Sequence, residues 1–293
     1  MTVNLVFFNQ NFKYGGVSEE SYLFSPEALQ ESSIFSVRST ESKMRIVAHR
    51  GDSDDAPENT IPALEQAVEN GYTTAECDVS WTKDDVPVLL HDNTINRTAR
   101  KSNGMRFFTN RKVASYTFDQ LQNFDFGSWF SGRFKGTKIP SLQEALDYAK
   151  ENNLELYLDL KNNVDVDDDK IATLVSMVRD SGMEDSVSWI SFNAKTLQKI
   201  ATAMPDARLG YLSKKPITDQ TIETLNSLKN DTNDVFLDIK HTELDEKGIA
   251  KLNQAGFYYE AWTVDDNREA MELAKYGCRG ITTNKLHGIT LSN

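Results

Sequence analysis

The chain of 293 residues is poor in several residue types, and each shortage excludes something. Its only two cysteines, Cys77 and Cys278, are too few for a disulfide framework, and we expect both to be small buried side chains. No apolar run is long enough to span a membrane, and residues 1–30 lack the basic start and sustained apolar stretch of a secretory signal. We therefore expect a cytoplasmic protein without a membrane span; virion or cell-surface association stays open.

Positive charge is also in deficit. The sequence holds 44 acidic against 32 basic residues, a formal net charge of −12. This balance argues against nucleic acid or an anionic membrane as the main partner. If the ligand is an anion, a local group of the protein must hold it against the overall negative charge. The hydrophobic content of 39% allows a substantial core, in one large domain or two small ones.

Eight short β-rich runs alternate with stretches of helical period from Met44 onward. This rhythm predicts a TIM (β/α)₈ barrel, whose functional sites lie at the carboxyl ends of the strands; a doubly wound open sheet is the main alternative. The expected strands are Arg45–His49, Thr74–Ser80, Leu154–Leu160, Val187–Phe192, Leu209–Ser213, Val235–Lys240, Phe257–Val264 and Gly280–Thr282.

Two segments do not fit the repeat. After the second strand, "WTKDDVPVLLHD" predicts a hairpin, and residues 93–138 predict a small insertion over the barrel mouth. Residues 1–43 form an N-terminal extension in which "SPEALQESSIFSV" could form a short helix. Because the chain ends soon after the eighth strand, we expect this extension to cover the surface that a full eighth helix would cover.

The strand "TAECDVSW" places Glu76 and Asp78 on one face, because side chains alternate along a strand. Two such carboxylates repel each other unless a cation lies between them. A pair of salt bridges is the simpler interpretation. A Ca²⁺ or Mg²⁺ site is the better one, since no cluster of Cys and His favours zinc.

A third candidate ligand lies in "LELYLDLKNN", where Asp159 and Lys161 share a face at the end of a strand. Lys161 could neutralise an anion bound to the metal. The sixth strand repeats the spacing with Asp238 and Lys240, so spacing alone does not choose between the two aspartates. Strand order weakly favours Asp159, because the third strand of a barrel neighbours the second.

Two of only four histidines end strand-like runs: His49 in "VAHRG" and His91 in "VLLHD". Two histidines beside a carboxylate cluster can divide acid and base work, and Arg50 offers a planar fork for phosphate. These residue types together predict phosphoryl transfer to water or to a neighbouring hydroxyl. We expect His241 and His287 to be structural or exposed.

The sequence contains, in order, the motifs "AHRG", "APENTIPALEQAVENG", "ECDVSWTKDDVPVLLHD", "GSWF" with "FKGTKIPSLQEAL", "LYLDLK", "AWTVDD" and "GITTNKL". Over roughly residues 44–286 this ordered set resembles the glycerophosphodiester phosphodiesterase family. The resemblance implies a TIM barrel over residues 44–293 and hydrolysis of glycerophosphodiesters to glycerol 3-phosphate and an alcohol, with Ca²⁺ or Mg²⁺.

The resemblance also implies roles for single residues. His49 and His91 match the family's acid/base pair, and Arg50 matches its phosphate contact. Glu76 and Asp78 match two metal ligands.

The family's third ligand is usually the glutamate of a Glu-x-Lys pattern. Here Asp159 stands in that place, one methylene shorter, with Lys161 intact. Glu58 in "PENT" would brace the site, and Trp262 would pack on the glycerol moiety. The resemblance also implies that Asp238 and Lys240 do not bind the metal, and that they either support the ligands or face solvent.

Two other functions stay open. The same chemistry could act on a glycerophosphate polymer such as teichoic acid, in a cell-wall or phage-tail context, or the barrel could bind phosphodiesters without catalysis. The sequence assigns neither the oligomeric state nor which histidine is the acid. We expect Asp52, Asp54 and Asp55 to be solvated charges at the rim, and the aspartates of "NNVDVDDDK" to lie in a solvated loop and at a helix start.

Overall fold

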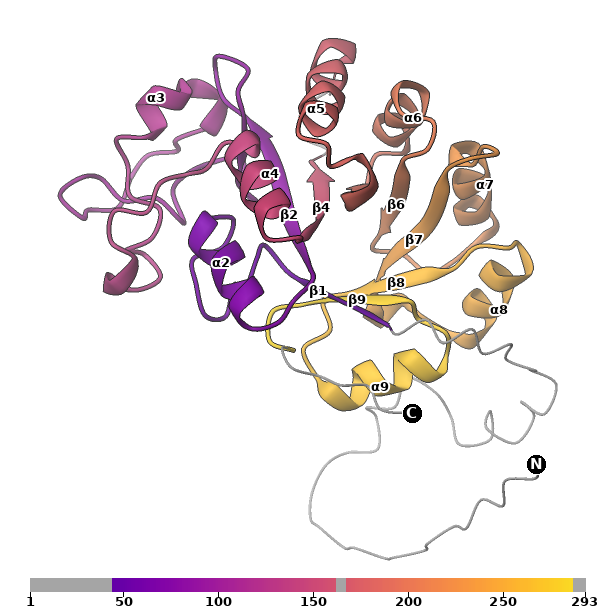
Figure 1. Ribbon diagram of the computed structural model, residues 1–293. Coiled ribbons are helices and arrows are strands. Elements are labelled where there is room, and N and C mark those ends of the chain that lie inside the picture. Colours follow the sequence, from indigo (N-terminus) through magenta and orange to yellow (C-terminus); the bar gives the residue numbers. More distant parts are fainter. Residues whose placement is uncertain (1–43, 162–166, 287–293) are drawn as a thin grey trace, which may run out of the picture. The chain divides into compact units, whose positions relative to one another are not determined.

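Eight parallel strands close into a barrel in the computed structural model, which describes residues 44–161 and 167–286 (Figure 1). Strand β1 closes the ring by pairing in parallel with both β2 and β9. The predicted barrel is therefore confirmed, and the open sheet is wrong. The barrel strands are β1 (Arg45–Ala48), β2 (Thr74–Trp81), β4 (Glu155–Leu160), β5 (Val187–Ser191), β6 (Arg208–Ser213), β7 (Asp234–Lys240), β8 (Tyr259–Trp262) and β9 (Gly280–Thr283).

The helices between these strands form an outer layer around the barrel (Figure 1). Their starts follow local rules: Ser141 and Glu144 form a reciprocal capping box before α4, and Thr60 caps α2. None of the described helices has the length and apolar character needed to cross a membrane. The helices are α2 (Ile61–Glu69), α4 (Leu142–Glu151), α5 (Asp168–Asp180), α6 (Ala194–Ala203), α7 (Asp219–Leu228), α8 (Glu246–Gln254) and α9 (Asn267–Lys275).

The strand bounds differ little from those expected. The largest difference is in β8, which is Tyr259–Trp262 rather than Phe257–Val264. The expected N-terminal helix and its covering role belong to residues 1–43, which lie outside the described residues. His287 also lies outside the described residues. Asp167 caps α5 and Asp168 and Asp169 lie in its first turn, as expected for that part of the acidic run.

Between β2 and α4 the chain leaves the barrel and forms the insertion (Figure 1). β3 (Pro87–Leu89), antiparallel to β2, leads into the insertion, which covers residues 93–138 and contains α3 (Phe118–Leu121). Single turns of 3₁₀ helix occur at Val113–Ser115 and Gly132–Phe134 here, and at Glu184–Ser186 and His241–Glu243 elsewhere. The insertion and the residues that flank it share a core of their own, made of Val88, Leu90, Ile95, Ala99, Val113, Leu121, Phe126 and Ile139.

A network of charged groups fills the barrel near the amino-terminal ends of its strands. The Arg208 guanidinium binds Glu260 Oε1 at 2.5 Å and Ser188 Oγ at 2.8 Å, and also contacts the hydroxyl of Tyr157. That hydroxyl donates to Glu260 Oε2 at 2.9 Å. A Cβ at Gly280 would lie 2.7 Å from the Glu260 carboxylate, so glycine is needed there.

Candidate active site

Three buried carboxylates meet near the carboxyl-terminal ends of β2 and β4. Glu76 and Asp78 project from the same face of β2, and Asp159 stands opposite Asp78 in the register of β4. Carboxylate oxygens of the three residues lie within 4.8 Å of one another. The structure thus brings the three expected ligands together, without Asp238 in the group.

Lys161 neutralises part of this acidic group. Its Nζ lies 2.5 Å from Asp78 Oδ1 and 2.5 Å from Asp159 Oδ2. Burial alone would lower the pKa of Lys161, but the two aspartates raise it above its ordinary value. The ammonium therefore stays charged and holds the two strands' carboxylates together.

The carboxyl groups of β2 differ in their electrostatics. Burial and the neighbouring Asp78 raise the pKa of Glu76 well above its ordinary value. Burial would also raise the pKa of Asp78, but Lys161 and Arg50 together bring it well below the usual range. The site is therefore short of positive charge on the Glu76 side.

The residues present fit a hard divalent cation. Asp159 Oδ1 is buried without a hydrogen-bond partner, although buried carboxylate oxygens are normally paired. An all-carboxylate donor set suits Ca²⁺ or Mg²⁺ rather than zinc.

The loop after β1 carries Arg50 into the acidic group. Arg50 has a left-handed backbone with φ of 61°, and its amide N–H donates to Glu76 Oε2 at 2.9 Å. Its Nε lies 3.2 Å from Asp78 Oδ2, but this ion pair lacks the alignment of a hydrogen bond. At Gly51, where φ is 74°, a Cβ would lie 2.7 Å from Ala63, so glycine lets the loop pass close to α2.

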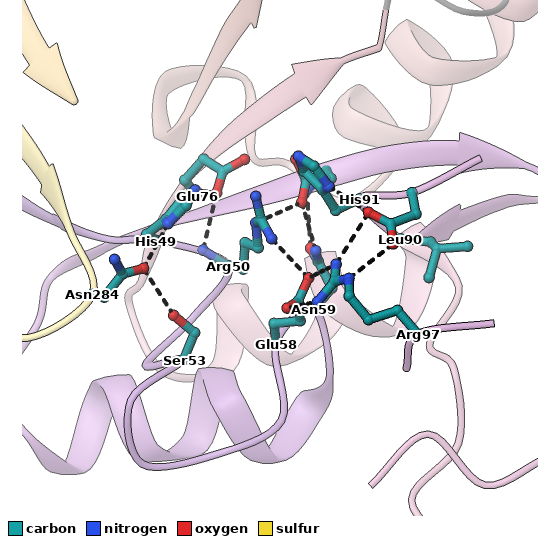
Figure 2. Close-up of polar contacts among 12 residues, drawn as sticks. His49, Arg50, Ser53, Glu58, Asn59, Glu76, Leu90, His91, Arg97 and Asn284 are labelled. Atoms are coloured by element: carbon teal, nitrogen blue, oxygen red, sulfur yellow. Dashed lines mark hydrogen bonds and ion pairs between the residues drawn. The ribbon is translucent and has the colours of Figure 1, made fainter. Parts of the chain in front are cut away.

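The "PENT" turn holds the site from the other side. Glu58 Oε1 accepts from Arg50 Nη1 at 2.8 Å, and the same carboxylate pairs with Arg97 of the insertion at 2.5 and 2.8 Å. Asn59 donates to Asp78 Oδ2 at 2.6 Å and accepts from the Asp78 amide at 3.0 Å. Figure 2 shows Glu58 between the two arginines.

His49 follows the last residue of β1, and Figure 2 shows its ring against the side chain of Asn284. Its Nδ1 lies 2.7 Å from Asn284 Oδ1, and Asn284 Nδ2 donates to Asp265 Oδ2 at 2.8 Å. Because a carboxylate only accepts hydrogen bonds, Asp265 binds the Asn284 nitrogen and so turns the Asn284 oxygen toward His49. That oxygen is also an acceptor, so the proton between the two residues must be on His49 Nδ1.

The other ring nitrogen of His49, Nε2, lies 4.0 Å from Glu76 Oε2. Burial, together with the charge of Arg50, lowers the pKa of His49. His49 is therefore neutral at pH 7, with an unprotonated Nε2 facing the acidic group.

His91 lies on the other side of Arg50 in Figure 2, just after β3. Its Nδ1 is 2.7 Å from Asp92 Oδ1, and Arg97 Nε holds the other oxygen of Asp92 at 2.8 Å. Arg97 thus connects the carboxylate partner of His91 to Glu58. His241 instead pairs with Glu269 of α9 and does not line the cavity.

These groups surround a cavity of about 280 Å³. One wall is apolar and basic: the Trp262 and Phe192 rings pack edge to face at 5.8 Å, and Lys214 Nζ lies 4.9 Å from the Phe192 ring centre. The cavity is lined by His49, Arg50, Glu76, Asp78, His91, Asp159, Lys161, Ile190, Phe192, Leu212, Lys214, Asp238, Trp262, Thr263 and Thr282.

Asp238 lines this cavity and is almost completely buried, with its Oδ1 unpaired. Burial and the nearby Glu260 raise its pKa well above the ordinary value. The main-chain oxygen of Asp238 accepts from Trp262 Nε1 at 3.1 Å and so helps to fix the indole.

The prediction that three aspartates of the first loop are solvated is wrong for Asp52. Its side chain is 1% exposed, because its carboxylate turns toward the end of α2 and accepts from Asn70 Nδ2 at 2.7 Å. Asp54 and Asp55 are exposed as expected. Cys77 and Cys278 are buried and unpaired, also as expected.

Four residues around the site were not predicted to lie there: Lys214, Arg97, Asn284 and Asp265. Lys214 and Arg97 lie outside the quoted motifs, and Asn284 and Asp265 meet His49 only through barrel closure. A signal existed only for the last two, which lie in the motifs "GITTNKL" and "AWTVDD".

Comparisons with known proteins show the family of the chain. Residues 49–287 match the model of the glycerophosphoryl diester phosphodiesterase family. A Bacillus subtilis protein, YhdW, is 31% identical over 82% of this chain and 94% of its own length. The glycerophosphodiester phosphodiesterase of Caldanaerobacter subterraneus is 28% identical over 83% and 94% of the two chains.

Solved structures show the same fold. A phosphodiesterase of Oleispira antarctica, in complex with its product sn-glycerol-3-phosphate, superposes with a TM-score of 0.74 and 26% identity over 83% of this chain and 93% of that one. The glycerophosphodiester phosphodiesterase of Agrobacterium tumefaciens gives 0.66 at 24% identity, covering 83% and 96%. The chain belongs to the glycerophosphoryl diester phosphodiesterase family.

Proposed function

We propose that the protein hydrolyses glycerophosphodiesters to glycerol 3-phosphate and an alcohol. The observation that carries this proposal is the meeting of three carboxylates with His49, Arg50 and Lys161 around one cavity. A phosphodiester needs its negative charge neutralised, its nucleophile activated and its leaving alkoxide protonated. This set of side chains offers a group for each task.

Glu76, Asp78 and Asp159 would hold a divalent cation, Ca²⁺ or Mg²⁺. When bound, this cation supplies charge stabilisation for the non-bridging oxygens of the phosphate. Lys161 and Arg50 are the protein's own cations at the site, and both are fixed by carboxylates. Arg50 would orient the phosphate, and Trp262 with Phe192 would pack against the glycerol.

The hydrogen bonds favour one division of labour between the histidines. Since Asn284 keeps the proton of His49 on Nδ1, the free Nε2 would take the proton of the nucleophile. His91, held by Asp92, would then donate its proton to the leaving alkoxide. The nucleophile is water, or the glycerol 2-hydroxyl, which would first close a cyclic phosphate.

The test compares glycerophosphocholine, glycerophosphoethanolamine and purified teichoic acid as substrates, with and without EDTA. His49→Ala should abolish turnover, and His241→Ala, outside the cavity, is the matched control. Metal-dependent release from the small diesters supports the proposal. Release from the polymer alone would move the substrate to teichoic acid, and binding without release in every arm would leave a non-catalytic barrel.

A further inference from the structure

Charge is distributed very unevenly along this acidic chain. The insertion, residues 93–138, holds nine basic residues and two acidic ones, Asp119 and Asp125, a net charge of +7. The rest of the chain therefore carries −19. The overall deficit of positive charge hides a basic segment that hydrogen bonds through Arg97 to the active site.

Within the insertion, residues 101–112 form a loop that we call the basic loop. It has the sequence "KSNGMRFFTNRK", with four basic residues and no acidic one. Arg106, Arg111 and Lys112 are all exposed. The loop therefore presents uncompensated positive charge to its surroundings.

The same loop exposes apolar side chains. Phe108 is 90% exposed and Met105 is 48% exposed, and they are two of the three large hydrophobic residues that the described part of the chain exposes. The third, Met271, lies on α9. A phenylalanine with this exposure lacks the stabilisation that burial would give it.

The structure holds this loop in a defined form. Asn96 Nδ2 donates to the main-chain oxygens of Phe107 and Thr109 at 3.3 and 2.9 Å, and Asn96 Oδ1 accepts from the Arg111 amide at 2.9 Å. Phe107 packs edge to face on Phe124, with ring centres 5.0 Å apart. Because Phe107 is turned into the insertion, the adjacent Phe108 is left facing outward.

We propose that the basic loop docks the protein on an anionic phospholipid surface, with Phe108 and Met105 entering the interface. Basic residues that surround exposed apolar side chains are the pattern of interfacial binding, in which burial of apolar groups adds to attraction for anionic headgroups. A soluble polyanion would account for the charge but would leave Phe108 exposed. Such docking is a surface contact and needs no spanning helix.

The proposal is tested by sedimenting the full chain with vesicles of phosphatidylcholine, and of phosphatidylcholine with an equimolar amount of phosphatidylglycerol. We expect binding to the anionic vesicles only, weakening as salt rises. Phe108→Ser, and the triple variant Arg106→Glu, Arg111→Glu, Lys112→Glu, should each weaken binding about tenfold or more. Turnover of soluble glycerophosphocholine should not change.

Matched controls separate the loop from general effects. Met271→Ser removes the exposed large hydrophobic side chain that lies outside the loop, on α9, and Lys195→Glu, Lys247→Glu, Lys275→Glu makes the same charge change on exposed helical positions. Both controls should reduce vesicle binding less than their loop counterparts. Absence of binding to anionic vesicles, or equal binding by loop variants and controls, would overturn the proposal. Capture by soluble polyglycerol phosphate without vesicle binding would assign the loop to a polymer instead.

Discussion

Charged groups lie at both ends of the barrel, but they are paired differently. At the amino-terminal end, the polar atoms of Arg208, Glu260 and Tyr157 bind one another in one connected network. At the carboxyl-terminal end, carboxylates exceed cations, and Asp159 Oδ1 has no partner. The first arrangement stabilises the fold, because buried charges are costly unless paired. The carboxyl-terminal arrangement leaves carboxylate oxygens that could bind a cation.

Breaking the carboxyl-terminal end should give the largest effect, on activity rather than on stability. Glu76→Gln should lower kcat/KM by about 10³-fold or more, since it removes a ligand of the proposed divalent cation. The metal-free protein should be as stable as wild type or more so, because repulsion with Asp78 is removed. Steady-state kinetics and urea unfolding in EDTA measure the two effects. A large loss of stability would show that the two ends do not differ as described.

Breaking the amino-terminal end should do the opposite. Arg208→Met should lower the free energy of unfolding by about 3–5 kcal/mol, because it leaves the buried Glu260 carboxylate without its closest cation. Below the unfolding transition, kcat/KM should stay within about threefold of wild type. Arg268→Met, at an exposed arginine of α9, is the control for loss of the charge itself. An unchanged urea midpoint would contradict this role of the network.

A substitution at Asp265 tests whether the hydrogen bonds around His49 matter for activity. Asp265→Ala frees the Asn284 amide to turn its nitrogen toward His49 and so disturbs the tautomer required for a base. We expect kcat/KM to fall by about 10–100-fold, mainly in kcat. Asp54→Ala changes an exposed carboxylate of the nearby loop and should change little. Equal effects of the two substitutions would exclude an orienting role for Asp265.

The smallest effect is expected in the insertion, away from both ends. Asp125 Oδ1 accepts from the amides of Gly127 and Ser128 at 2.8 and 2.9 Å. Burial alone would raise the pKa of Asp125, but these hydrogen bonds to the carboxylate lower it below its ordinary value. The folded state therefore binds fewer protons than the unfolded state, and the stabilisation is present above pH 3.8 and lost as pH falls further. Asp125→Asn should cost about 1 kcal/mol at pH 7. Urea unfolding at several pH values should show this difference shrinking below pH 3.8.

Much of the carboxyl-terminal end could be predicted, because its information is local. Strand alternation placed Glu76 and Asp78 on one face, and strand order weakly favoured Asp159 over Asp238 as their neighbour, which the register of β4 confirms. The burial of Asp52 depends on Asn70, which no pattern in the loop indicates. The Arg208 network could not be predicted, since its members come from different strands and meet only through barrel closure.

The bond between His49 and Asn284 joins residues 235 positions apart. During synthesis His49 therefore emerges long before its partner Asn284 has been made. Strand β9, which carries Asn284 next to its end, is also the strand that completes the barrel against β1. In the proposed mechanism His49 would thus be oriented only after β9 has emerged and closed the barrel, so a chain that stops before β9 would lack an oriented base.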